Sequence, residues 1–350
     1  MTPESAAALL ETIPTPLILI GRDQTVLAMN EPSERLVGAH MKGRHYITAL
    51  RQPNLLDKVE QVLRSGEAAD ARYLGRDAGR DTVFQVHIAS CPLGVVLSFK
   101  DKTADEDIDQ LRRDFVANVS HELRTPLTAL TGFIETLRGA AKDDPIAQDR
   151  FLTIMEREAG RMTRLVDDLL SLSRVETESR VRPSEHVDLA SLVGATIANL
   201  EPVLDQSGVS IHVDDQTNAA LVLGDQNQLR QVVSNLIENA AKYGHEGGNI
   251  FISMTPPAYE VALRAEGLRL IVRDDGPGIA AHHLARLTER FYRVDSHRSR
   301  EVGGTGLGLA IVKHIVNRHR GRLQIDSIEG EGTILTIILP TQPTKNAPTS

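Results

Sequence analysis

Residues 115–127 read FVANVSHELRTPL, and this stretch lies in a long helical pattern that begins at Thr103. Within the pattern, His121 is off the apolar stripe, so we expect its ring to face water. A neutral imidazole is a nucleophile near pH 7, and the adjacent Glu122 can accept the proton of its other ring nitrogen. A lone His-Glu pair is far more often part of an ordinary solvated surface, so its meaning depends on the rest of the chain. The apolar stripe consists of Ile108, Leu111, Phe115, Val119 and Leu123.

A second helical pattern follows the turn at residues 142–145. Its apolar positions recur at alternating spacings of four and three, with one polar interruption. They are Phe151, Met155, Glu158, Met162, Leu165, Leu169 and Leu172. We therefore expect a helical hairpin over residues 103–177. Such a hairpin cannot bury its stripes alone, so pairing with a second copy into a four-helix bundle is expected. Packing against another part of the same chain is the alternative.

Helices and strands alternate through residues 187–341, which predicts a C-terminal α/β sandwich domain. Residues 178–186 are polar and are expected to form a linker, and the Pro- and Thr-rich residues 342–350 a disordered tail. Helices are expected at 188–206, 225–243 and 307–319, and strands at 209–214, 250–254, 268–274, 322–327 and 333–339.

Residues 1–102 mix short β-like runs with one helical stretch near Leu55–Arg64. Turn signals such as Gly21-Arg22-Asp23 separate these elements. The pattern predicts a small α+β domain. The chain as a whole is therefore expected to be a multidomain α+β protein.

Composition excludes several classes of protein. The 39 Lys and Arg against 47 Asp and Glu give a net charge of −8, which argues against a nucleic-acid-coating protein. The single cysteine, Cys91, excludes an intrachain disulfide framework and fits a reducing compartment. The longest early apolar run, Pro16–Ile20, is far shorter than the about 18 residues of a membrane span. We expect a cytoplasmic protein, or the cytoplasmic part of a membrane-associated sensor whose membrane segment is missing from this chain.

Asn235, Asn239 and Lys242 follow at i, i+4 and i+7 in the helical pattern 225–243, so they share one edge. Two amide oxygens and an ammonium suit Mg²⁺ with phosphate, because Mg²⁺ takes few protein oxygens. A solvated polar face is the alternative for this motif taken alone.

Two glycine motifs flank a loop-like stretch, Phe291-Tyr-Arg-Val-Asp295. Asp274-Asp-Gly-Pro-Gly-Ile279 ends a predicted strand, and its glycines allow close backbone approach to a flat ligand. Gly303-Gly-Thr-Gly-Leu-Gly-Leu309 runs into a helix, where glycine amides can cradle phosphates. Each motif alone also fits an ordinary turn or hinge.

Taken together and in this order, these motifs resemble the bacterial sensor histidine kinases of two-component systems. FVANVSHELRTPL is similar to the phosphoacceptor box, NLIENAAKY to the N box and DDGPGI to the first glycine box. ERFYRVD is similar to the F box and GGTGLGLAI to the second glycine box. The resemblance covers about residues 103–340, and its details resemble the phosphate-regulon sensor subgroup. It implies a C-terminal ATP-binding domain of the GHKL, or Bergerat, type.

The resemblance implies four catalytic residues. His121 would be phosphorylated from ATP, with Glu122 as its acid/base partner. Arg293 would meet the transferring phosphoryl group, and Thr125 would position a water that dephosphorylates the partner. The protein would then be both kinase and phosphatase.

The resemblance also implies a nucleotide site with Mg²⁺ on Asn239, helped by Asn235. Asp274 would take the adenine amine, and Lys242 would contact phosphate. The full nucleotide-binding set would be Asn235, Asn239, Lys242, Tyr243, Asp274, Gly276, Gly278, Gly304, Thr305, Gly306, Leu307 and Gly308. Two departures stand out: Asp275 where Asn is common, and His319-Arg320-Gly321 in place of His-Gly-Gly.

Related ATP sites in gyrase, Hsp90 and MutL proteins place a water-activating Glu where this chain has Asn235. An amide is no base, so the sequence favours phosphoryl transfer to His121 over ATP hydrolysis. The implied function is an ATP-dependent histidine kinase that acts as a homodimer and passes phosphate to a separate response regulator. A non-catalytic dimeric scaffold and a GHKL ATPase are the alternatives.

The N-terminal residues resemble a PAS sensor domain. Met29-Asn-Glu-Pro32 with Leu36-Val-Gly38 is similar to the Asn and Leu-Gly of such domains. Residues 95–101 are similar to their last strand, which leads into the signalling helix. His40, His45 and His87 suggest a haem site only weakly, because lone histidines are usually surface residues.

Overall fold

The computed structural model describes residues 3–77, 79–178, 182–217, 221–245, 247–294 and 304–341. Gly303, the end of the F-box stretch at Asp295 and the tail 342–350 lie outside the described residues, as do residues 179–181 of the expected linker. The chain divides into two compact units, Met1–Ala117 and Asn118–Ser350. Among the described helices, none combines the length and the apolar character that a membrane crossing requires.

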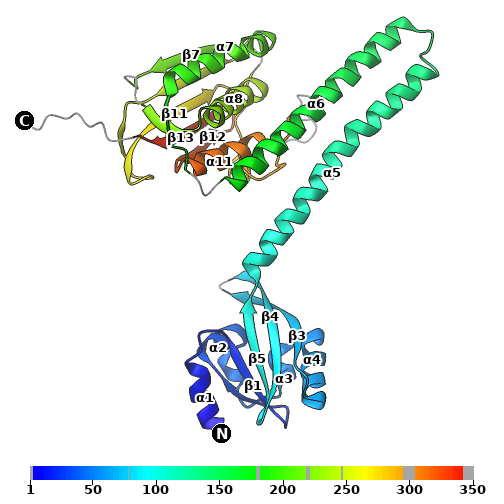
Figure 1. The fold of residues 1–350 in the computed structure, drawn as a ribbon, viewed down its shortest axis with the longest axis vertical. Coiled ribbons are helices and arrows are strands. Elements are labelled where there is room, and N and C mark those ends of the chain that lie inside the picture. The colour runs from blue at the N-terminus through cyan, green and yellow to red at the C-terminus, as the bar shows by residue number, and fades with distance from the viewer. Residues whose placement is uncertain are drawn as a thin grey trace, which may run out of the picture. The chain divides into compact units, whose positions relative to one another are not determined.

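The N-terminal unit is built on a five-stranded antiparallel sheet in the order β2-β1-β5-β4-β3 (Figure 1). Helix α1 (Pro3–Glu11) packs on one face with a small apolar cluster, and α4 (Pro53–Ser65) belongs to the larger cluster of the other face. The strands are β1 (Leu17–Gly21), β2 (Val26–Met29), β3 (Ala69–Asp77), β4 (Arg80–Cys91) and β5 (Gly94–Asp101). The shorter helices are α2 (Glu31–Val37), η1 (Ala39–Met41) and α3 (Tyr46–Leu50).

Asn30 holds the start of α2 against β1. Its buried amide oxygen accepts hydrogen bonds from the backbone N–H of Leu17 at 2.8 Å and of Ser33 at 3.2 Å. Its amide nitrogen donates to the carbonyls of Ile13 at 2.9 Å and Thr15 at 2.7 Å. One side chain therefore satisfies several backbone groups of three segments, which explains why an amide is needed at this buried position.

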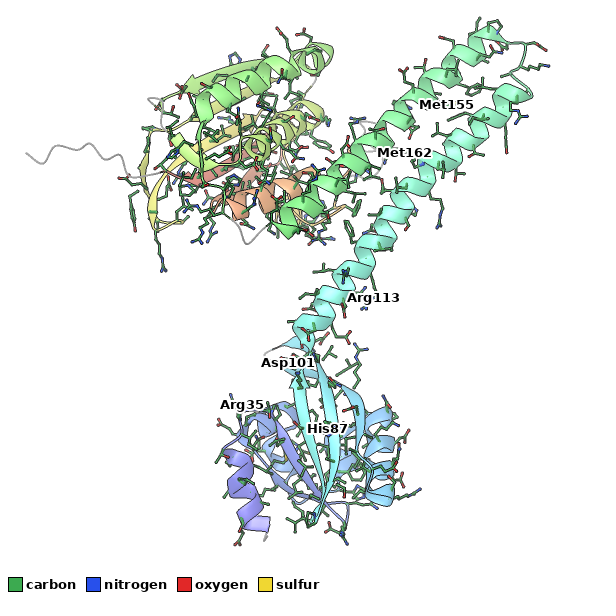
Figure 2. The ribbon with its side chains drawn as sticks, viewed as in Figure 1. Arg35, His87, Asp101, Arg113, Met155 and Met162 are labelled. Carbon is green, nitrogen blue, oxygen red and sulfur yellow. The ribbon has the colours of Figure 1, made fainter. Side chains whose placement is uncertain are left out.

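The helical hairpin consists of α5 (Thr103–Arg138) and α6 (Pro145–Thr177). Helix α5 continues through Pro126, and Asp144 caps α6 by accepting from two backbone N–H groups. Met155 and Met162 of α6, labelled in Figure 2, are half-buried. The other end of α6 packs against α11 (Gly308–Arg318) of the same chain, where Leu165, Leu172 and Val175 are buried. The alternative of packing within the chain therefore holds for this part of the stripe.

The C-terminal domain has a sheet in the order β12-β13-β11-β9-β7, with β10 paired to β11 at its edge. All of its pairs are antiparallel except the parallel pair β7–β9. Helices α7, α8 and α11 form the second layer of the sandwich (Figure 1). The bounds are α7 (Leu189–Ser207), β7 (Ser210–Asp215), α8 (Gln226–Tyr243), β9 (Asn249–Met254), β10 (Ala258–Glu260), β11 (Ala265–Asp274), α9 (Ala281–Leu284), β12 (Arg322–Ile328) and β13 (Gly332–Pro340).

Each helix and strand expected in this domain is present within one to three residues of its expected bounds. Three short strands of this domain were not predicted from the sequence: β6 (Glu185–Asp188), β8 (Leu221–Gly224) and β10. Strands β6 and β8 pair with each other, so the last two residues of the expected linker belong to a strand. Strands of three or four residues are too short to show a clear alternation, which explains the omission.

Helix α11 ends in a turn that usually requires glycine. Arg320 has a φ of 55°, in the left-handed region. Its N–H donates to the carbonyl of Asn317 and that of Gly321 to the carbonyl of Val316, the paired bonds of a Schellman motif. The departure noted in the sequence therefore puts an arginine where an L-residue is strained.

We predict that Arg320→Gly stabilises the C-terminal domain by about 0.5–1 kcal/mol, because relief of left-handed strain exceeds the extra entropy that glycine loses on folding. Urea unfolding followed by circular dichroism measures the change. Arg320→Ala is the control, because it removes the same side chain but keeps the strain, and it should be nearly neutral. Equal effects of the two substitutions would contradict the prediction.

Candidate functional site

A cavity of about 400 Å³ opens in the C-terminal domain beside α8. Its walls come from α8, from the loop after β11, from the segments on either side of residues 295–303, and from α6. Among the residues named from the sequence, those lining the cavity are Asn235, Asn239, Lys242, Tyr243, Asp274, Gly278, Arg293, Gly304, Thr305, Gly306 and Gly308. The structure thus brings together residues that lie 73 positions apart, such as Asn235 and Gly308.

Helix α8 presents its polar edge to the cavity, while its opposite face is buried. Asn235 donates from its amide nitrogen to the carbonyl of Gly308 at 3.3 Å, which leaves its amide oxygen available as a ligand atom. Lys242 forms an ion pair with Glu238 at 2.8 Å. Asn235 and Asn239 line the cavity one helical turn apart, and their amide oxygens are a donor set that fits Mg²⁺.

Asp274 lies at the end of β11, and its partly buried carboxylate accepts from the N–H of Gly276 at 2.9 Å and of Thr333 at 3.3 Å. Burial raises the pKa of this carboxyl group above its usual value, while the two N–H donors oppose the rise. The neighbouring Asp275 accepts from the backbone and side-chain nitrogens of Asn249 and braces the loop instead. Only the first of the two carboxylates therefore lines the cavity.

Two glycines of the site cannot carry a side chain. A Cβ on Gly278, whose φ is +68°, would lie 2.0 Å from the carbonyl oxygen of Ile328. A Cβ on Gly306, whose φ is +73°, would lie 2.9 Å from the Cα of Phe291. Phe291 also donates its N–H to the carbonyl of Gly306 at 2.9 Å, so this bond joins the F-box stretch to the second glycine motif.

Two of the expected nucleotide-binding residues do not line the cavity. The side chain of Leu307 is fully buried in the core. Gly276 is buried beneath the loop, where a Cβ would lie 2.7 Å from the carboxylate of Asp274. These two residues therefore serve packing, and a ligand in the cavity would contact their neighbours instead.

His121 is exposed on α5, as expected, and it is not among the residues that line the cavity. The adjacent Glu122 forms an ion pair with Arg161 of α6 at 2.8 Å. Arg293, which lines the cavity, places its guanidinium 3.8 Å from the same carboxylate. The hydroxyl of Thr125 donates to the carbonyl of His121 at 3.2 Å. The carboxylate beside the exposed histidine is therefore linked directly to the wall of the cavity.

Residues of α6 line the cavity without having been named from the sequence. They are Arg164, Asp167 and Asp168, and Arg161 lies one turn away. Arg161 also explains the polar interruption of the apolar stripe, because it lies 4.0 Å from Glu158. Asp168 contacts Thr305, 137 residues away, and Arg161 contacts Glu122, 39 residues away, so helical periodicity carried no signal for them.

The contacts that position Tyr292 were also not predicted from the sequence. It lines the cavity and shares a 2.5 Å hydrogen bond with Nδ1 of His283. The guanidinium of Arg286 lies over its ring, 4.2 Å from the centroid. These contacts fix the tyrosine ring from the side of α9.

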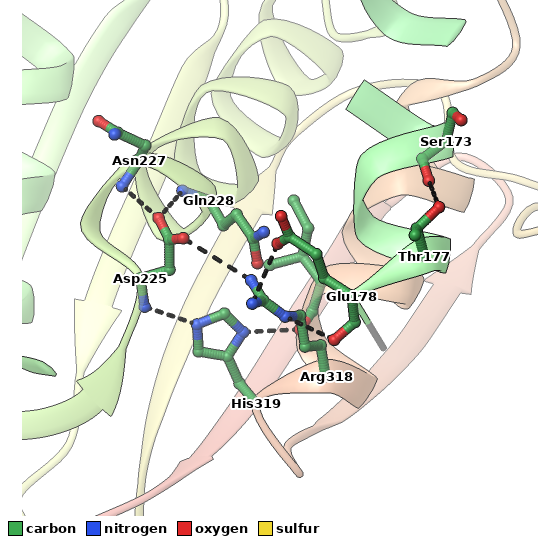
Figure 3. A network of polar contacts seen from close by, with 9 residues as sticks. Ser173, Thr177, Glu178, Asp225, Asn227, Gln228, Arg318 and His319 are labelled. Atoms are coloured by element: carbon green, nitrogen blue, oxygen red, sulfur yellow. Dashed lines mark hydrogen bonds and ion pairs between the residues drawn. The ribbon is translucent and has the colours of Figure 1, made fainter. Parts of the chain in front are cut away.

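A second set of polar contacts joins the end of α6 to α8 and α11 (Figure 3). Arg318 donates to the carbonyl of Glu178 at 3.2 Å and lies 3.0 Å from its carboxylate. His319 is fully buried, with Nε2 accepting from the N–H of Asp225 at 3.0 Å and Nδ1 donating to the carbonyl of Ile315 at 2.8 Å. This places the start of α8, the helix that carries Asn235, in a fixed position against α11.

The fold and site define a phosphoacceptor-type hairpin joined to an ATP-binding domain, and comparisons with known proteins agree. Residues 111–178 match the family described as "His Kinase A (phospho-acceptor) domain". Residues 224–343 match "Histidine kinase-, DNA gyrase B-, and HSP90-like ATPase". The chain therefore belongs to the family of sensor histidine kinases, and its C-terminal domain is an ATP-binding domain.

Two curated relatives match about 70% of this chain. The chain is 42% identical over 242 residues to the phosphate regulon sensor protein PhoR of Pseudomonas aeruginosa, covering 68% of this chain and 52% of that protein. It is 40% identical over 251 residues to the sensor histidine kinase WalK of Bacillus subtilis, covering 71% and 39% respectively. The chain thus spans about half the length, or less, of these relatives. In fold it is similar to the histidine kinase ThkA, solved in complex with a response regulator protein, with a TM-score of 0.53, 21% identity and coverage of 97% and 99%.

We predict that His319 makes the stability of the C-terminal domain depend on pH. Burial lowers the pKa of His319 below 6.5, so the folded domain keeps the ring neutral while the unfolded chain takes up a proton. Stability should therefore fall as pH drops below about 6.5, by at most about 1.4 kcal/mol per pH unit. Urea unfolding of wild type and His319→Gln tests this, because the gap between the two should narrow with falling pH. His282→Gln, on an exposed ring, is the control, and parallel curves for His319→Gln would contradict the prediction.

We predict that Asp274→Asn weakens adenine-nucleotide binding at least about tenfold, because an amide presents a donor as well as an acceptor to the base and disturbs the bonds from Gly276 and Thr333. Calorimetric titration with a non-hydrolysable ATP analogue measures the loss. Asp275→Asn is the matched control, because its carboxylate braces Asn249 rather than the cavity. A larger loss in the control than in Asp274→Asn would overturn the assignment.

Proposed function

We propose that this chain is an ATP-dependent histidine kinase that phosphorylates His121 and passes the phosphoryl group to an aspartate of a separate response regulator. The observation that carries the proposal is the link between Arg293 and Glu122. One arginine lies both in the wall of the nucleotide cavity and 3.8 Å from the carboxylate beside the exposed histidine. A scaffold without catalysis has no need for this connection.

In the proposed mechanism, ATP lies between α8 and the glycine-rich segment at Gly304–Gly308. Nε2 or Nδ1 of His121 attacks the γ-phosphorus in line, an N–P bond forms, the bond to the β-phosphate oxygen breaks, and ADP leaves. Glu122 takes the proton from the other ring nitrogen as the ring becomes positive. The exposed position of His121 supports this role, because the ring is open to an approaching nucleotide.

Asn239, with Asn235, would hold Mg²⁺, which supplies charge neutralisation on the phosphate oxygens. Lys242 would contact phosphate, Tyr243 would lie by the adenine, and Asp274 would accept from the exocyclic amine. Asn235 stands where related ATPases carry a base, so water near the cavity is poorly activated. Phosphoryl transfer to the histidine is then favoured over hydrolysis.

The chain would act as a homodimer through α5 and α6, with residues 103–177 as the phosphotransfer hairpin and 187–341 as the catalytic domain. A phosphohistidine needs an acceptor, and we assign that role to a receiver domain on another protein. Thr125, one turn after His121, would hold the water that dephosphorylates the regulator. Residues 1–102 would be a PAS-type sensor domain, and the need for ATP places the activity in the cytoplasm.

We predict that incubation with γ-labelled ATP gives an acid-labile, base-stable label on the protein, and that His121→Gln abolishes it. The reason is that glutamine offers no nucleophilic ring nitrogen. His282→Gln is the control, because this histidine is exposed on α9 and should leave labelling unchanged. Nucleotide binding without label would favour a scaffold. Steady phosphate release without phosphoprotein would favour an ATPase and would overturn the proposal.

A further inference from the structure

Asp168 reaches the nucleotide cavity from α6, outside every motif of the nucleotide domain. It lines the cavity, and its Oδ2 accepts a hydrogen bond from the hydroxyl of Thr305 at 2.7 Å. The same hydroxyl accepts from the N–H of Leu307 at 3.3 Å. The carboxylate of Asp168 therefore holds the glycine-rich segment 304–308 through the side chain of Thr305, close to the start of α11.

The surroundings of this carboxylate are rich in negative charge. Burial raises the pKa of Asp168 and the hydrogen bond from Thr305 lowers it, while the charge of Glu238 raises it further and that of Lys242 lowers it. Lys242 is itself paired with Glu238 at 2.8 Å. Asp167 lines the cavity as well. The neighbouring charges that act on Asp168 therefore come from two carboxylates and one ammonium, while the guanidinium groups of Arg164 and Arg293 also line the cavity.

This end is also where the proposed function puts the phosphates. Gly304 and Gly306 line it next to Thr305, and Lys242 is the cation assigned to phosphate. A nucleoside triphosphate brings several negative charges to this place, a nucleoside diphosphate brings fewer, and a nucleoside brings none. Repulsion at short range in a partly buried site is only weakly screened.

We infer that Asp168 determines how the site responds to nucleotide charge: its carboxylate holds Thr305 when the phosphate end is empty and opposes the entry of phosphate groups in proportion to their charge. The inference rests on the proposed function of the cavity as an ATP site. It follows that triphosphate binding weakens the Asp168–Thr305 contact, and, by reciprocity, that this contact between α6 and the glycine-rich segment lowers affinity for the triphosphate.

Asp168→Asn tests the inference, because an amide oxygen still accepts from Thr305 while the charge is removed. Calorimetric titrations of the full chain, at mildly alkaline pH and fixed Mg²⁺, would use a non-hydrolysable ATP analogue, ADP and adenosine. We expect affinity to rise about tenfold for the ATP analogue, about threefold for ADP and not at all for adenosine. A merely structural role of Asp168 would not produce this dependence on ligand charge.

Two further variants keep the test sharp. Asp168→Ala removes both charge and acceptor and should give the same order of gains, which covers the case in which the amide variant folds poorly. Asp149→Asn makes the same change of charge on an exposed position of α6 that is not among the cavity residues, and it should leave all three affinities unchanged.

Equal gains for all three ligands, or a loss of affinity for the ATP analogue, would overturn the inference. Labelling of His121 together with equal gains would overturn the inference alone and leave the proposed function intact. Failure of the wild-type chain to bind any of the three ligands would overturn the proposed function, and the inference with it.

Discussion

The site depends on ion pairs in which the helical hairpin supplies the carboxylate and the nucleotide domain supplies the guanidinium group. Glu122 faces Arg293, Glu176 faces Arg290, and Glu178 faces Arg318. His314 adds a weaker contact to Glu176 at 3.6 Å. Because most of these carboxylates are partly exposed, each pair contributes no more than about 1 kcal/mol. Beside the buried apolar contact between α6 and α11, the nucleotide domain is therefore held against the hairpin by several weak ion pairs, and each of these can be exchanged for another at small cost.

Arg293 shows why this exchange matters. Its side chain is only 9% exposed and lies beside Glu122, which is also paired with Arg161. Glu122 therefore faces two guanidinium groups, that of Arg161 on α6 and that of Arg293 in the wall of the cavity. Under the proposed function, the same arginine meets the transferring phosphoryl group, and its departure from Glu122 leaves that carboxylate with one cation instead of two. Movement of one side chain would then both stabilise the phosphoryl group and remove one of the two cations beside the proton acceptor.

The sequence was sufficient for those features in which one residue type meets one local demand. The glycines at 278 and 306 stand where a Cβ meets backbone, and the edge of α8 follows from helical spacing alone. The sequence was not sufficient for Asp168 and Arg161, because their partners lie 137 and 39 residues away and a charged residue on a helix looks the same whether it faces water or a ligand. Short strands such as β6 and β8 were not predicted for a related reason, since each is stabilised by pairing with the other and neither shows a clear alternation of its own.

The apolar stripe of α6 is long enough both to pack against the nucleotide domain of the same chain and to pair with a second copy. Its C-terminal part packs against α11 within the chain, and Leu165, Leu172 and Val175 of this part are buried. Its N-terminal part stays half-buried in a single chain, where Phe151 packs on Phe133 with ring centroids 5.4 Å apart. The surface left for a second copy therefore lies toward the hairpin turn, while the nucleotide domain uses the opposite end. Because the two interactions occupy different lengths of one helix, the nucleotide domain can leave α6 without opening the part of the bundle on which pairing would depend.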